Sequence, residues 1–156
     1  APRPIALAAI KYADLSSGLQ KDYVFDAERM VQTTGDTGPY LQYAHARCCQ
    51  VLRNADETGL TERAVTRVDE PAEQALAMAL SRFGDVVHEL AQNLQPHKLC
   101  TYLFELATAY STFYEQCPIL KSEGEVRVSR LGLCEATRDV LAAGLDLLGI
   151  EAPERM

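Results

Sequence analysis

The sequence contains no tryptophan, and none of its apolar runs approaches the roughly 18 residues that a membrane-spanning helix requires. The apolar stretch PIALAAI near the start is too short and too poorly flanked for a secretory signal peptide. The five cysteines form no C-x-x-C pair and are odd in number, which favours reduced thiols over a disulfide framework. These absences predict a cytoplasmic protein with no membrane partner.

Basic residues are scarce, because 15 Lys and Arg stand against 22 Asp and Glu, which gives a formal net charge of -7. A chain of this charge repels polyanions at long range, so nonspecific binding to nucleic acid is not favoured. Any contact with nucleic acid would need a local basic patch. The 156 residues, 47% of them hydrophobic and 24% charged, match a single globular domain.

The motifs of common active sites are also missing. The sequence has no Gly-rich phosphate loop and no G-x-S-x-G element. His45 and Cys48 share a helix face, but a zinc site needs about four ligands. The pair Asp85 and His88 has the spacing found in di-iron bundles, which require a second copy and further carboxylates. We therefore expect no catalytic residue, metal or cofactor, and a metal-binding helical enzyme is the weakest of three hypotheses.

Apolar residues recur at intervals of three and four along most of the chain, which predicts an all-α fold, an antiparallel helical bundle. The strand signals are confined to KDYVF, residues 21–25. Asp26 and Thr37 are candidate N-caps, and Gly149 is expected to end the last helix in a left-handed conformation. The predicted helices are 4–15, 26–32, 39–56, 71–83 continuing to about 94 after an interruption at Gly84, 96–117 and 126–148.

Two stripes are expected on the helix that begins at Pro39. One is apolar and predicted to face the core: Leu41, Ala44, Cys48, Val51, Leu52 and Ala55. The other is predicted to face solvent, with Gln42 and Arg53 flanking it: Tyr40, Tyr43, Arg47, Gln50 and Asn54. Rings beside an arginine suit unstacked bases, although tyrosines at the border of a core are also common. On the helix from Pro96, Tyr114 closes a core pattern and is able to protrude.

Five blocks follow one another along nearly the whole chain: IALAAIKYADL, YVFDAERM, GDTGPYLQYAHAR, YLFELATAYSTFYEQCPIL and GLDLLGIEAPERM. Together they resemble the C-terminal part of bacterial arginyl-tRNA synthetases. The resemblance implies an all-helical anticodon-binding domain of the DALR type over residues 26–156. Residues 1–25 would then be a segment that trails from the catalytic module.

The resemblance also implies which residues approach the anticodon arm of arginine tRNA. Tyr40, Tyr43, Tyr114 and Met156 match family positions near the tRNA, and Arg53 lies further along the same helix. We add Arg47 because it shares the stripe of Tyr43. We add Arg155 because it is the neighbour of Met156.

In this family the parent enzyme uses ATP to attach arginine to tRNA, on a nucleotide-binding fold with HIGH-like and KMSKS-like motifs. Neither motif occurs in this chain, so we expect it to bind tRNA weakly and not to aminoacylate. Its expected partners are the tRNA and the catalytic module of the same enzyme, and we expect a monomer. The alternative is a free-standing paralogue that uses the same helices as a protein- or RNA-interaction module.

Overall fold

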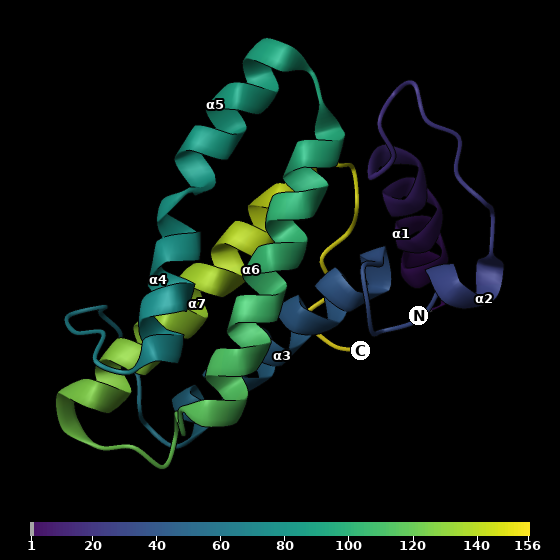
Figure 1. The fold of residues 1–156 in the computed structure, drawn as a ribbon. Coiled ribbons are helices and arrows are strands. Elements are labelled where there is room, and N and C mark those ends of the chain that lie inside the picture. Colours follow the sequence, from purple (N-terminus) through teal and green to yellow (C-terminus); the bar gives the residue numbers. More distant parts are fainter. Residues whose placement is uncertain (1) are drawn as a thin grey trace.

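The computed structural model describes residues 2–156, and within them every regular element is a helix, which confirms the all-α prediction (Figure 1). KDYVF lies between helices and forms no strand. No helix in the described part of the chain is long and apolar enough to cross a membrane. The helices are α1 (Pro2–Leu15), α2 (Ala27–Met30), α3 (Gly38–Glu57), α4 (Pro71–Ser81), α5 (Phe83–Asn93), α6 (Pro96–Gln116) and α7 (Gly124–Leu147).

The helix ends follow local chemistry. The Thr37 hydroxyl accepts a hydrogen bond from the Tyr40 N–H at 3.1 Å, and the Asp26 carboxylate accepts one from the Arg29 N–H at 3.1 Å, so both predicted caps are confirmed. Gly149 has a φ of 69°, as the left-handed end of α7 requires. The interruption predicted at Gly84 is wrong, because α4 ends before Arg82 and Gly84 lies inside α5.

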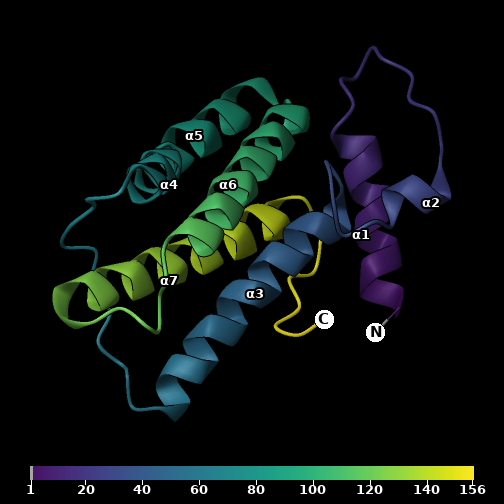
Figure 2. The ribbon, with the colours of Figure 1, turned by 60° about the horizontal axis from the view of Figure 1, so that its bottom comes forward.

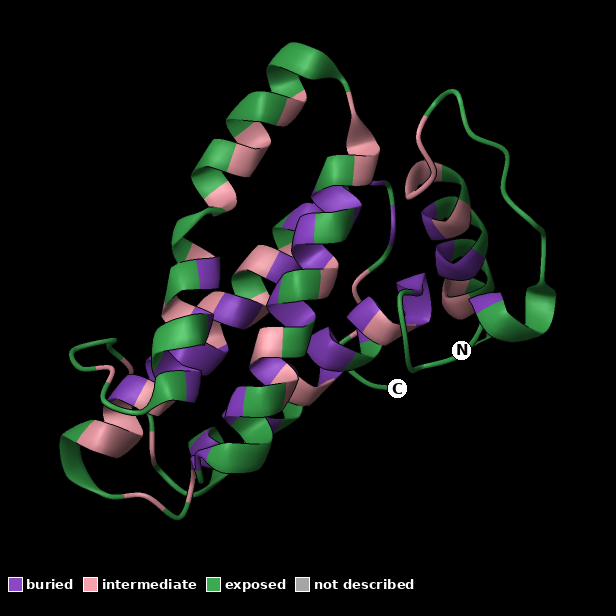
Figure 3. Ribbon diagram, viewed as in Figure 1, coloured by how far each residue is buried: buried purple, intermediate pink, exposed green. Residues whose placement is uncertain are grey.

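The core lies between α3, α4, α6 and α7, whose inward faces are buried (Figure 3). All six residues of the predicted core stripe of α3 are buried, so that prediction is confirmed. All five cysteines are buried, and within residues 2–156 they form no disulfide. Burial therefore explains the cysteines as packing residues.

α1 and α2 sit at one side of this bundle, beside the start of α3 (Figures 1 and 2). Ala8 and Tyr12 are buried in the main core, and Ala9 is buried near α2. The opposite face of α1 leaves Leu7 and Ile10 about half exposed, so this helix has an apolar surface that the bundle does not cover. The division of the chain after residue 25 stays a prediction.

Gly38 allows the close contact between α1 and α3. A Cβ built at this position overlaps the Ala8 carbonyl and lies 3.0 Å from Tyr12 Cβ. We expect Gly38→Ala to destabilise the fold by about 1–3 kcal/mol, because backbone atoms cannot give way as a flexible side chain does. Urea unfolding followed by circular dichroism measures this change.

The matched control is Gly84→Ala, since Gly84 also lies in a helix but has no atom within 4 Å of a built Cβ. This change should stabilise the protein by up to about 1 kcal/mol through helix propensity alone. Equal effects of the two substitutions would contradict the proposed contact between α1 and α3.

Candidate nucleic-acid interface

A stack of three side chains stands on the outer face of α3 and the last turns of α6. The Arg47 Cζ atom lies 4.7 Å from the ring centroid of Tyr43 and 4.7 Å from that of Tyr114. The Arg47 guanidinium also donates a hydrogen bond of 2.9 Å to the Tyr43 hydroxyl. Tyr43 is 39% exposed and Tyr114 is 42% exposed. This Tyr–Arg–Tyr stack (Tyr43, Arg47 and Tyr114) therefore offers ring faces and a cation to an outside partner.

The charge of Arg47 is maintained by its neighbours. Partial burial by itself lowers the pKa of Arg47, but the hydrogen bond to Tyr43 and the electrostatic effect of Tyr43, Tyr114 and Tyr110 outweigh it. The pKa of Arg47 is therefore raised above its ordinary value. The guanidinium is therefore positive at neutral pH.

Beside the stack lies a hollow of about 530 Å³, which the C-terminal residues help to form. A second hollow of about 420 Å³ adjoins it and shares Arg47, Gln50, Asn54 and Tyr114. We call the first of these the α3–C-terminal hollow. Its lining residues are Tyr43, Ala46, Arg47, Gln50, Arg53, Asn54, Glu57, Tyr114, Glu154, Arg155 and Met156.

Six of the seven residues predicted to bind tRNA thus line one hollow, although they come from three separate parts of the chain. These six are Tyr43, Arg47, Arg53, Tyr114, Arg155 and Met156. Tyr40 is not among them. Its ring packs against Phe104 with centroids 5.8 Å apart, and its hydroxyl lies 3.4 Å from the Ser111 Oγ atom. A tRNA-binding role of Tyr40 stays a prediction.

Arginine side chains outnumber acidic side chains in the lining of the hollow, unlike in the chain as a whole. Three arginines and two glutamates line it, whereas the chain as a whole has a net charge of -7. Two of the arginines, Arg53 and Arg155, lie on α3 and next to the chain end respectively. Phosphate contacts by arginine do not need a positive molecule, only a positive site.

Sequence reasoning missed the residues that hold the C-terminal segment beside α3. Gln42, expected to flank the exposed stripe, is completely buried and donates a hydrogen bond of 2.8 Å to the Glu151 carbonyl. His45, considered only as a metal ligand, lies 3.0 Å from the Pro153 carbonyl. The spacing of these polar residues on one helix face was the available signal, but nothing local in the sequence showed what would cover them.

No three His, Cys, Asp or Glu side chains within residues 2–156 lie where they could hold a metal ion. His45 has Cys49 as its neighbour, with the sulfur 3.8–3.9 Å from the ring nitrogens. His88 faces Gln92 at 3.2 Å on the exposed surface of α5. Neither histidine is surrounded by the further ligands that a zinc or di-iron site requires.

Residues 41–156 match the family described as the DALR anticodon binding domain. The matched residues include most of α3, all of α6 and the C-terminal residues that line the hollow. The chain belongs to this family. The match begins within α3 and includes every residue predicted to bind tRNA except Tyr40. The predicted resemblance and fold class are therefore confirmed.

This DALR domain is similar to proteins named arginine–tRNA ligase. That of Cutibacterium acnes is 67% identical, over 97% of this chain and 30% of its own length. That of Frankia casuarinae is 51% identical, over 96% of this chain and 25% of its own length. The domain thus spans less than a third of the curated relatives it matches. Their common name does not favour the alternative of a free-standing paralogue.

Solved structures agree with the sequence relatives. The arginyl-tRNA synthetase of Thermus thermophilus superposes with a TM-score of 0.88 and 36% identity, over 99% of this chain and 27% of that chain. The arginyl-tRNA synthetase of Plasmodium falciparum superposes with a TM-score of 0.82 and 30% identity, over 98% of this chain and 27% of that chain. Both alignments include α1 and α2, which precede the residues of the family match.

Proposed function

We propose that this DALR domain recognises the anticodon arm of arginine tRNA within an arginyl-tRNA synthetase. The observation that carries the proposal is the α3–C-terminal hollow, where two exposed tyrosines and three arginines converge. Unpaired anticodon bases can stack on Tyr43 and Tyr114, while Arg47, Arg53 and Arg155 contact phosphates. Stacking and phosphate contacts are the usual means by which proteins hold single-stranded loops of RNA.

In the proposed whole enzyme, ATP-dependent arginylation takes place on the catalytic module, outside these 156 residues. ATP is thus a cofactor of the parent enzyme and not of this domain, which should not aminoacylate by itself. The exposed apolar face of α1, with Leu7 and Ile10, supports a contact with that module. We further infer that the domain acts in the cytoplasm and as a monomer.

We expect Tyr43→Ala to weaken binding of a labelled arginine-tRNA anticodon stem-loop by about 5- to 150-fold, since one lost stack corresponds to about 1–3 kcal/mol. Deleting Met156 should weaken binding by a smaller factor. Fluorescence anisotropy titrations at two salt concentrations measure both effects. Affinity should fall with salt because the arginines displace counterions from phosphates.

Tyr23→Ala is the matched control, because Tyr23 is 42% exposed but does not line the hollow. Its removal should leave the affinity unchanged. Equal affinities for the cognate loop and a scrambled loop would contradict anticodon recognition, and would favour the paralogue instead.

A further inference from the structure

The segment that follows α7 is held through its backbone carbonyls. Lys11 on α1 donates to the Gly149 carbonyl, and Gln42 donates to that of Glu151 at 2.8 Å. His45 bonds the Pro153 carbonyl at 3.0 Å. The two carbonyls held from α3 at 3.0 Å or less, those of Glu151 and Pro153, are two residues apart. The side chains of Ile150 and Ala152 pack against the core.

The donors on α3 form one stripe beneath this segment. The donors are Gln42, His45 and Arg53, and Cys49 lies between the last two; spacings of three, four and four residues place all four on one face of the helix. Gln42 is 0% exposed and His45 is 4% exposed. α3 therefore has three faces, one toward the core, one toward the α3–C-terminal hollow and one beneath the C-terminal segment.

The hydrogen bonds of the buried donors are made inside the protein. A carbonyl can only accept, so His45 must carry its proton on Nδ1 to bond Pro153. The amide of Gln42 donates to Glu151 and also to the Pro4 carbonyl at 3.2 Å. Neither Gln42 nor His45 lines the α3–C-terminal hollow. Within three residues of the Pro153 carbonyl, however, the chain supplies Arg155 and Met156 to that hollow.

We propose that Gln42 and His45 are positioning residues, which place Arg155 and Met156 in the tRNA site by holding the carbonyls of Glu151 and Pro153. The consequence for RNA rests on the proposed function, whereas the placement of the chain end does not. Arg53 adds a long contact of 3.4 Å to the Glu154 carbonyl and so bridges the held segment and the hollow. Residues 155 and 156 themselves are exposed, so they owe their position to what precedes them.

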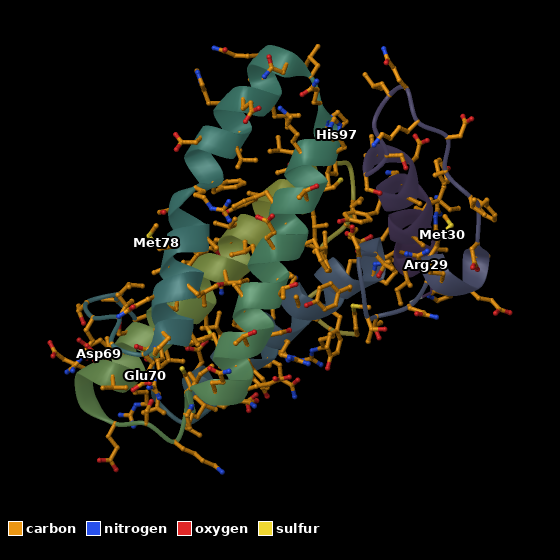
Figure 4. All side chains as sticks on the ribbon, in the orientation of Figure 1. Arg29, Met30, Asp69, Glu70, Met78 and His97 are labelled. Atoms are coloured by element: carbon orange, nitrogen blue, oxygen red, sulfur yellow. The ribbon has the colours of Figure 1, made fainter. Side chains whose placement is uncertain are left out.

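The sequence provides a direct probe, because it contains only three methionines. Labelling their methyl groups with carbon-13 gives three NMR signals that report separate sites. Met30 is buried on α2, and Met78 is 68% exposed on α4 (Figure 4). Met156 is 48% exposed in the hollow. Met78 is thus a reference for an exposed methyl group, and Met30 reports whether the fold is intact.

In Gln42→Leu and His45→Leu, the Met156 signal should sharpen and move to the position of a free chain end. The signals of Met30 and Met78 should stay where they are in the unaltered chain. His45→Asn should keep the original Met156 signal, because the asparagine Nδ2 atom can donate from nearly the position of the histidine Nδ1 atom. Tyr102→Phe is the matched control, since it removes a buried bond of the same kind, to the Ala79 carbonyl at 2.7 Å.

The proposal fails if the Met156 signal is unchanged in both leucine variants, or if Tyr102→Phe changes it equally. In the RNA titration, each leucine variant should weaken binding as much as removing Arg155 and Met156. In a protein that already lacks Arg155 and Met156, the leucine substitution should cause no further loss of affinity. That result would show that Gln42 and His45 act on binding through these two residues. Additive losses would overturn the proposed positioning. If the Met156 signal changes as expected but the protein does not bind the stem-loop, the result would support positioning and contradict the proposed function.

Discussion

Replacing Arg47 with alanine should weaken binding of the anticodon stem-loop by on the order of 100-fold, about 2–3 kcal/mol, because the proposed site loses a positive charge and the group that holds two tyrosine rings in place. The guanidinium keeps Tyr43 and Tyr114 on either side of it, at 4.7 Å from each ring centroid. Its removal therefore also frees both rings to rotate. Anisotropy titration with the cognate loop measures the loss.

Two variants separate the stack from charge alone. Arg47→Lys keeps the charge but lacks the planar group that lies between two rings, so it should restore only part of the affinity. Arg82→Ala removes an arginine that also lies over a tyrosine, 5.6 Å from the Tyr102 centroid and outside the hollow. This control should bind as the unaltered chain does. Full affinity in Arg47→Lys would show that charge alone matters.

Replacing Glu73 with alanine should destabilise the fold by about 3–5 kcal/mol, because it leaves a partner charge buried without compensation. Glu73 on α4 pairs with Arg130 on α7, and the two side chains are 4% and 12% exposed. The other carboxylate oxygen accepts hydrogen bonds from the N–H groups of Asp69 and Glu70, which Figure 4 marks at the start of α4. Urea unfolding at neutral pH measures the change in free energy.

The same pair predicts how stability depends on pH. Burial by itself raises the pKa of Glu73, but the bonds from Arg130 and from the backbone of Glu70 and Asp69 outweigh it. The pKa is therefore lowered from 4.5. A carboxylate whose pKa is lower in the folded state stabilises the fold above its unfolded pKa, and this contribution disappears as pH falls through the folded value.

We therefore expect Glu73→Gln to flatten the loss of stability between neutral pH and the acid range below 4.5. The control is Glu89→Gln, because Glu89 also has a lowered pKa but pairs with Lys98 in solvent. That substitution should change stability little. An equal effect of the two would show that burial of the Glu73–Arg130 pair is unimportant.

The faces of α3 show what periodicity can predict. The core stripe and the exposed stripe follow from residue spacing alone, because burial of a helix face repeats with the helical period. Tyr114 joins Arg47 only because the end of α6 lies beside the middle of α3, which no local pattern contains. The resemblance to a family implies only that Tyr43 and Tyr114 both lie near the tRNA, and Arg47 is added from its stripe on α3.

The errors have tertiary causes. Gly84 was expected to interrupt a helix, but a glycine in a helix interior costs only about 1 kcal/mol and can be tolerated. The chain turns at Arg82 instead, where Phe83 stacks on Tyr102 with centroids 6.0 Å apart. Gln42 is polar and borders an exposed stripe, yet the C-terminal segment covers it completely. Burial by a distant segment cannot be read from helical spacing.

The carbonyl contacts of the C-terminal segment separate two kinds of sequence change. Every residue supplies the same carbonyl, so the exposed side chains of Glu151 and Glu154 are free to vary without altering the bonds to α3. One residue added between Gly149 and Pro153 instead shifts the later carbonyls relative to Gln42 and His45, so it changes which carbonyls these side chains can reach. The number of residues between α7 and Pro153, more than their identity, therefore sets where Arg155 and Met156 lie along α3.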